Sequence, residues 1–148
     1  MNRLFACILL SALAAYSLAS PYEDCGSDSG QVSAVEVSDC ADGQDTCTLK
    51  KGTQAQITIK FNSKTDTKSL KAVVHGVISG VPIPFPLPNP DACKAGVSCP
   101  VKSGESYTYS DKLDIKTSYP PVSVKVRYEL KGENDDDLVC VEIPCQIS

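Results

Sequence analysis

The chain has 148 residues, of which 18 are acidic and 14 are basic, for a net charge of −4 at pH 7. That negative balance, with no basic cluster, argues against nucleic acid as a partner. Once the first segment is set aside, the remaining length suits a single domain.

The N-terminal segment predicts a secretory signal peptide. Arg3 precedes an apolar run from Leu4 to Leu18, and small residues follow it. Ser17 and Ala19 stand where a signal peptidase requires small side chains, so we place the cut after Ala19, with Ser20 as the alternative. The run of about 15 apolar residues is shorter than the about 20 needed to cross a bilayer, which argues against a membrane anchor.

We therefore assign residues 1–19 to the signal peptide and residues 20–148 to one secreted, extracellular domain. Seven cysteines lie beyond the cut, and in an oxidising compartment we expect them to pair. Cys40 and Cys47 bracket one short polar stretch and Cys93 and Cys99 bracket another, so each pair can close a local loop. Zinc prefers tighter spacings, so we expect disulfides, no metal, and one thiol left over.

Strand signals dominate residues 20–148. Alternation of apolar and polar residues is clearest at 54–61 and 122–130, and it is weaker at 31–37, 107–113 and 138–147. The evenly apolar run 70–79 predicts a central strand that is covered on both faces. No stretch shows a sustained helical period, so we predict an all-β fold, an immunoglobulin-like β-sandwich of about seven strands.

Residues 81–88 alternate apolar side chains with proline. Such a segment is extended and stiff, and it cannot pair in the middle of a sheet because its prolines lack an amide hydrogen. We expect it at an edge or rim.

Residues for catalysis are scarce. His75, the single histidine, stands within the apolar run 73–77, which is typical of a strand histidine with a hydrogen-bonded ring. Common hydrolase, metalloenzyme and phosphate-binding motifs are missing, so we expect no catalytic residue, no cofactor and no enzyme. The acidic run 133–137 lacks the spacing of a calcium loop and predicts a solvated hairpin tip.

The function that remains for such an apolar interior is the binding of a hydrophobic ligand. Two sheets that splay apart leave an apolar cavity, and the inward positions of the last two strands are its expected lining: Val124, Val126, Tyr128, Val141 and Ile143.

Four segments, in order, resemble the ML lipid-recognition family: DCGS at 24–27, KAVVHG at 71–76, GVPIPFP at 80–86 and CVEIP at 140–144. The resemblance implies a sandwich whose sheets separate to admit a sterol. It also implies three disulfides, which join Cys25 to Cys140, Cys40 to Cys47 and Cys93 to Cys99. Cys145 is then the free thiol, and its parity with Val141 and Ile143 predicts that it lines the cavity.

The resemblance places ligand contacts at Phe85, Ile115 and Tyr119, with Val81 on the rim. It implies a monomeric carrier that binds and transfers a sterol or another apolar lipid, and that delivers it to an anionic membrane surface or a membrane-bound sterol acceptor. The chain lacks tryptophan, whereas vertebrate members carry large aromatic residues at the positions of Tyr128 and Val141. A carrier of fatty acids or semiochemicals is therefore the alternative, and an accessory of an immune receptor is a third reading that no residue favours.

Two further departures concern the rim and the destination. Ser79 stands where vertebrate members carry a larger apolar residue. The chain has no N-x-S/T acceptor, so the sequence does not support a glycan-dependent route to the lysosomal lumen.

Overall fold

The computed structural model describes residues 19–40 and 43–148, so the predicted signal segment up to residue 18 lies outside the described residues. Within them the chain forms nine strands and one short 3₁₀ helix: β1 Glu23–Asp24, β2 Gly30–Val37, β3 Cys47–Leu49, β4 Thr53–Ser63, β5 Leu70–Ile78, β6 Val81–Phe85, η1 Ala92–Lys94, β7 Ser106–Ile115, β8 Val122–Gly132 and β9 Asp137–Ile147. No helix among these residues is long and apolar enough to span a membrane.

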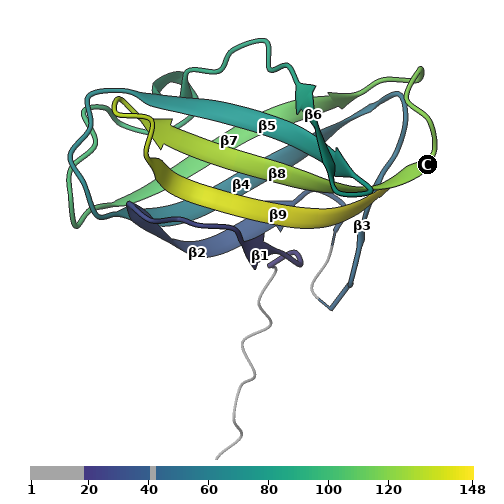
Figure 1. The fold of residues 1–148 in the computed structure, drawn as a ribbon, viewed down its shortest axis with the longest axis horizontal. Coiled ribbons are helices and arrows are strands. Elements are labelled where there is room, and N and C mark those ends of the chain that lie inside the picture. Colours follow the sequence, from purple (N-terminus) through teal and green to yellow (C-terminus); the bar gives the residue numbers. More distant parts are fainter. Residues whose placement is uncertain (1–18, 41–42) are drawn as a thin grey trace, which may run out of the picture.

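The strands form two sheets that pack face to face (Figure 1). The larger sheet has the order β1-β9-β8-β5-β6, and β3 pairs in parallel with β9. The smaller sheet has the order β2-β4-β7. The prediction of an all-β sandwich is confirmed, and the core lies between the inward faces of the two sheets.

Alternating burial explains why the predicted strands form. In β4, Ala55, Ile57, Ile59 and Phe61 are buried, whereas the polar residues between them face outward. The same alternation places Val124, Val126, Tyr128 and Leu130 of β8 in the core. Burying one face of each strand supplies most of the driving force for the two-layer arrangement.

The prediction for β5 was wrong in one respect. Only Leu70, Ala72 and Val74 of this strand are buried, while Lys71 is exposed and Val73 is half-buried. Neighbouring strands bond to both edges of β5, but its outward face is not covered by a further layer of the described residues.

The proline-rich segment forms β6 at the edge of the larger sheet, as predicted. Ser79 and Gly80, both with positive φ (49° and 80°), make the two-residue turn that brings Val81 opposite Ile78. Because Pro82 lacks an amide hydrogen, this strand suits an edge rather than a sheet interior.

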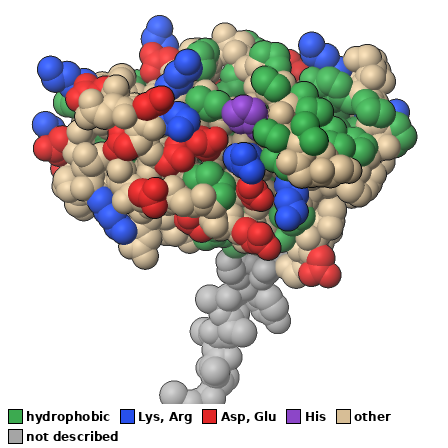
Figure 2. Space-filling model, viewed as in Figure 1, with side chains coloured by type: hydrophobic (Ala, Val, Ile, Leu, Met, Phe, Trp, Pro, Cys, Tyr) green, Lys and Arg blue, Asp and Glu red, His purple; other side chains and the backbone are tan. Residues whose placement is uncertain are grey.

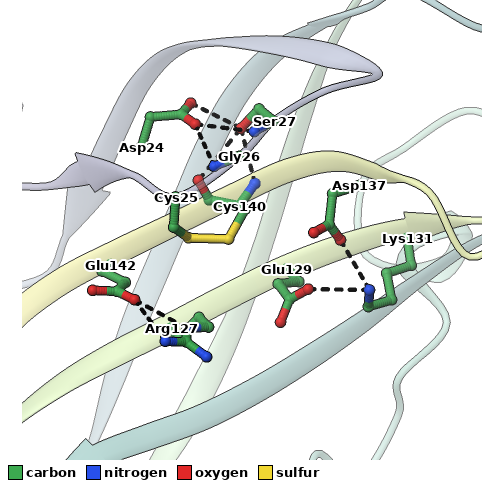
Figure 3. The surroundings of a disulfide bond; sticks show 10 residues. All are labelled: Asp24, Cys25, Gly26, Ser27, Arg127, Glu129, Lys131, Asp137, Cys140 and Glu142. Carbon is green, nitrogen blue, oxygen red and sulfur yellow. Dashed lines mark hydrogen bonds and ion pairs between the residues drawn. A yellow bond between two sulfur atoms is a disulfide. The ribbon is translucent and has the colours of Figure 1, made fainter. Parts of the chain in front are cut away.

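The disulfides tie peripheral segments to the sheets, with the pairings that the resemblance implied: Cys25 to Cys140, Cys40 to Cys47 and Cys93 to Cys99. Figure 3 shows the first of these, where the segment after β1 crosses β9.

Ser27 and Asp24 reinforce that crossing. The Cys140 amide donates to Ser27 Oγ at 2.9 Å, and the Asp24 carboxylate accepts from the Gly26 and Ser27 amides. Burial raises the pKa of Asp24, but these hydrogen bonds outweigh burial and hold the pKa below its usual value.

Candidate functional site

An apolar cavity of about 300 Å³ lies between the sheets at the end where β6 and the β7–β8 connection meet. Both sheets and the neighbouring loops contribute to its lining, which consists of Leu49, Val74, His75, Gly76, Ile78, Ile83, Pro84, Phe85, Leu113, Ile115, Tyr119, Pro120, Val122, Val124, Val126 and Ile147. Nearly all of these side chains are hydrocarbon, so the cavity suits an apolar ligand.

Strand alternation places much of this lining. Leu113 and Ile115 are inward positions of β7, and Val124 and Val126 are inward positions of β8. The lining therefore follows from the same period of two that forms the core.

Gly76 keeps part of the cavity empty. A Cβ atom built at this position would lie 3.3 Å from Val124 Cγ2, and the backbone of Gly76 is not in the left-handed region that favours glycine. A side chain at this position would therefore crowd Val124 and take up part of the cavity that both residues line.

Two aromatic rings stand at the mouth. Phe85, at the end of β6, and Tyr119, on the β7–β8 connection, have ring centroids 6.1 Å apart in an edge-to-face arrangement. Val81 and Ile83 of the adjacent rim are 59% and 48% exposed. Figure 2 shows hydrophobic side chains gathered beside His75, the purple side chain, over this end of the larger sheet.

A polar pair lies beyond the inner end of the cavity. The Tyr109 and Tyr128 hydroxyls are hydrogen-bonded to each other across the two sheets, and both side chains are fully buried. Burial raises the pKa of each phenol well above its usual value, so both hydroxyls stay neutral. Val126 lines the cavity and Tyr128, two residues further along β8, does not.

Five of the nine predicted ligand contacts line the cavity: Phe85, Ile115, Tyr119, Val124 and Val126. Val81 lies on the rim instead, where its side chain is largely exposed. Tyr128, Val141 and Ile143 do not line the cavity, because the sheets pack closely around them and leave them fully buried. Parity identified the inward face correctly but not the extent of the empty space.

Cys145 is not among the residues that line this cavity. Its thiol is free and the residue is 4% exposed, but it packs within the hydrophobic core, where β3 and β8 flank it opposite Cys47 and Val124. Burial raises the pKa of the Cys145 thiol to about 12.

His75 also departs from expectation. It contributes to the cavity lining, but its Nδ1 atom is buried and has no hydrogen-bond partner among the described residues. The prediction of a fully hydrogen-bonded ring was therefore wrong.

Sequence reasoning missed several lining residues, above all Val74 and Gly76 of β5 and Leu49 of β3. Parity within the run 70–79 could have found the first two. Because β3 has three residues, it is too short to show a period, and Leu49 carried no signal.

A charged cluster lies outside the cavity, on the outer face of the larger sheet (Figure 3). Lys131 Nζ lies 3.1 Å from Glu129 Oε2 and 3.1 Å from Asp137 Oδ1. Burial, with Glu129 nearby, raises the pKa of Asp137 to about 6. The acidic run 133–137 thus forms a hairpin tip, as predicted, but its last residue belongs to β9 and to this cluster.

Sequence comparisons with known proteins indicate a single family. The family model for the ML domain matches residues 19–147. The chain is 41% identical over 150 residues to "NPC intracellular cholesterol transporter 2" of Mus musculus, with 100% of this chain and 99% of that protein covered. It is 40% identical over 144 residues to "NPC intracellular cholesterol transporter 2 homolog a" of Drosophila melanogaster, with 97% of each covered.

Comparison with solved structures also finds similar proteins. The crystal structure of a Niemann-Pick type C2 protein from the Japanese carpenter ant matches with a TM-score of 0.82 and 31% identity, covering 86% of this chain and 99% of that one. Chicken MD-1, solved in complex with lipid IVa, matches with a TM-score of 0.52 and 18% identity over 83% of this chain and 85% of that one, which shows a shared fold alone.

Proposed function

The chain belongs to the ML domain family, and from that membership we propose that it is a secreted carrier that binds one lipid, a sterol first of all, between its two sheets and transfers it. The observation that carries the proposal is the apolar cavity behind Phe85 and Tyr119. The relatives named as cholesterol transporters supply the sterol as the leading ligand.

Hydrophobic contact alone provides enough affinity. A sterol of about 28 heavy atoms, at roughly −0.3 kcal/mol each, gains about −8 kcal/mol, which corresponds to roughly micromolar binding or better. No special polar contact is needed. A pocket of this kind discriminates by shape, and a missing methylene changes the binding free energy by only about 1 to 3 kcal/mol.

The cavity is small for such a ligand. Its volume of about 300 Å³ is at the lower end of the usual range for ligand sites, about 300 to 1,000 Å³. We therefore propose that the sheets move apart when a sterol enters. The small volume also favours the second candidate function, the carriage of fatty acids or semiochemicals, whose single chains are narrower.

Transfer requires contact with a donor or acceptor surface. Val81 and Ile83 expose apolar side chains beside the mouth, so a lipid leaving past Phe85 would meet the surface on which this rim rests. The proposed partner is an anionic membrane surface or a membrane-bound sterol acceptor, which the chain approaches as a monomer.

Extraction of the native ligand tests both the cavity and the function. The secreted protein is purified without detergent, and its lipid is identified by mass spectrometry. We expect one lipid per chain, a sterol for the leading function and a fatty acid or volatile for the second.

Gly76→Val provides the matched variant, because its side chain would occupy the cavity, and Val73→Leu, on the other face of β5, is the control. Lipid should be absent from the first variant and present in the second. A wild-type protein that carries no lipid and binds neither sterol nor fatty acid would exclude the proposed function.

A further inference from the structure

A second hollow, of about 260 Å³, adjoins the apolar cavity at its mouth. Phe85 and Tyr119 line both spaces, so this ring pair is the partition between them. The rest of the second hollow is formed by Pro86, Leu87 and Pro88 on one side and by Lys112, Asp114 and Lys116 on the other. We call this hollow the vestibule.

β7 supplies a wall to each space. Leu113 and Ile115 line the apolar cavity, whereas Lys112 and Asp114, which alternate with them, line the vestibule. Lys116 follows the end of the strand, and its carbonyl accepts a hydrogen bond from the Tyr119 amide at 3.1 Å. The apolar and charged spaces are thus joined by a few residues of one strand and one turn.

The vestibule has an excess of positive charge in an acidic protein. Asp114 Oδ1 accepts a hydrogen bond from Gln54 Nε2 at 2.7 Å. Lys112 and Lys116 form no ion pair with any of the described residues. At physiological ionic strength, charges beyond about 8 Å are largely screened, so these nearby groups dominate the field at the mouth.

We infer that the vestibule is a headgroup site for a lipid with a single carboxylate, whose hydrocarbon chain occupies the apolar cavity behind Phe85 and Tyr119. This inference rests on the proposed function. Lysine ammonium groups only donate hydrogen bonds, and their bonds to a carboxylate are stronger than those to a neutral hydroxyl. The cavity volume of about 300 Å³ favours a single chain over a wider ligand.

Three ligands test this assignment on the full secreted chain: oleic acid, oleyl alcohol and cholesterol. Their affinities are measured by the displacement of a bound fluorescent fatty acid. Oleic acid and oleyl alcohol differ at the headgroup alone. The wild type should bind the acid more tightly than the alcohol, and added salt should reduce that preference.

Replacing both lysines, Lys112→Gln with Lys116→Gln, should weaken acid binding about fivefold, as expected for partly exposed ion pairs, and leave the alcohol unchanged. Arginine at both positions should retain the preference, and Asp114→Asn should increase it. Lys102→Gln, near the opposite end of β7, is the matched control and should change neither affinity.

The inference is overturned if the wild type binds acid and alcohol equally, or if the lysine variants weaken both ligands alike. Binding of cholesterol with no preference for the acid would reject this headgroup site and leave the proposed function intact. Failure of all three lipids to bind would reject both.

Discussion

The hydroxyls of Tyr109 and Tyr128 meet between the two sheets, just beyond the inner end of the apolar cavity. One residue belongs to β7 and the other to β8, so their hydrogen bond joins the smaller sheet to the larger one. The Tyr109 hydroxyl also lies 3.5 Å from Asp111 Oδ2, so the two hydroxyls and this carboxylate form a short row of polar groups.

Removing one hydroxyl from this pair should destabilise the fold. Tyr128→Phe keeps the ring but leaves the Tyr109 hydroxyl short of a buried partner, which should cost about 1 to 2 kcal/mol. Urea unfolding measures the loss. Tyr22→Phe, at a half-buried position that packs against the core, should change the free energy of unfolding little, and equal losses in both variants would contradict the role of the pair.

Removing an aromatic ring at the mouth of the cavity should weaken lipid binding. Phe85→Ala or Tyr119→Ser removes one ring of the edge-to-face pair and the apolar area that it offers to a ligand, which should reduce affinity by about tenfold. Titration with a fluorescent sterol measures the change. Val81→Ser, on the exposed rim, should leave this equilibrium affinity unchanged; unaltered binding in both mouth variants would refute the site.

Acidification should stabilise the fold through Asp137. Its pKa is raised to about 6 in the folded state from 3.8, so the folded chain holds a proton that the unfolded chain has released between these values. The resulting stabilisation is fully present below pH 3.8 and is lost as the pH rises through about 6.

Asp137→Asn removes this titration. Between pH 5 and pH 7 the wild type should lose up to about 1 kcal/mol more stability than the variant, a figure reduced for the solvent access of this carboxyl. Unfolding curves at the two pH values test it, and Asp28→Asn, at an exposed turn, should behave as the wild type does. Identical pH dependence of wild type and Asp137→Asn would exclude the effect.

Cleavage after Ala19 should preserve a contact that cleavage after Ser20 would remove. Ser20 is 3% exposed; its hydroxyl donates to the Cys40 carbonyl and accepts from the Val37 amide, both at 2.9 Å. Ser20→Ala should therefore cost about 1 to 2 kcal/mol, whereas Ser33→Ala, at an exposed hydrogen bond, should cost less. Mass spectrometry of the secreted protein should find Ser20 as its first residue.

The Cys145 thiol should react slowly whether or not lipid is bound. It is buried and does not line the apolar cavity, and its pKa of about 12 leaves little thiolate near neutral pH. Labelling with a maleimide should be equally slow in loaded and lipid-free protein and fast after unfolding. Faster labelling on removal of lipid would show that the cavity reaches this residue.

Much of the fold followed from local pattern. Alternation predicted β4 and β8, and the prolines of residues 81–88 predicted an edge. Burial of one face per strand is a local signal that a sequence records directly.

The extent of the cavity did not follow from pattern. Tyr128 and Ile143 have the inward parity of Val126, but packing density rather than parity decides which inward side chains border empty space. The role of Gly76 could not be predicted from the sequence either, because it depends on how close this residue lies to Val124 on another strand.

The prolines of β6 have a further consequence for solubility. An edge strand with exposed Val81 and Ile83 would ordinarily offer a template on which a second chain could add a strand and begin an aggregate. Pro82 and Pro84 interrupt the row of amide donors that such growth requires. These prolines therefore disfavour the addition of a further strand at an edge whose apolar side chains are exposed to water.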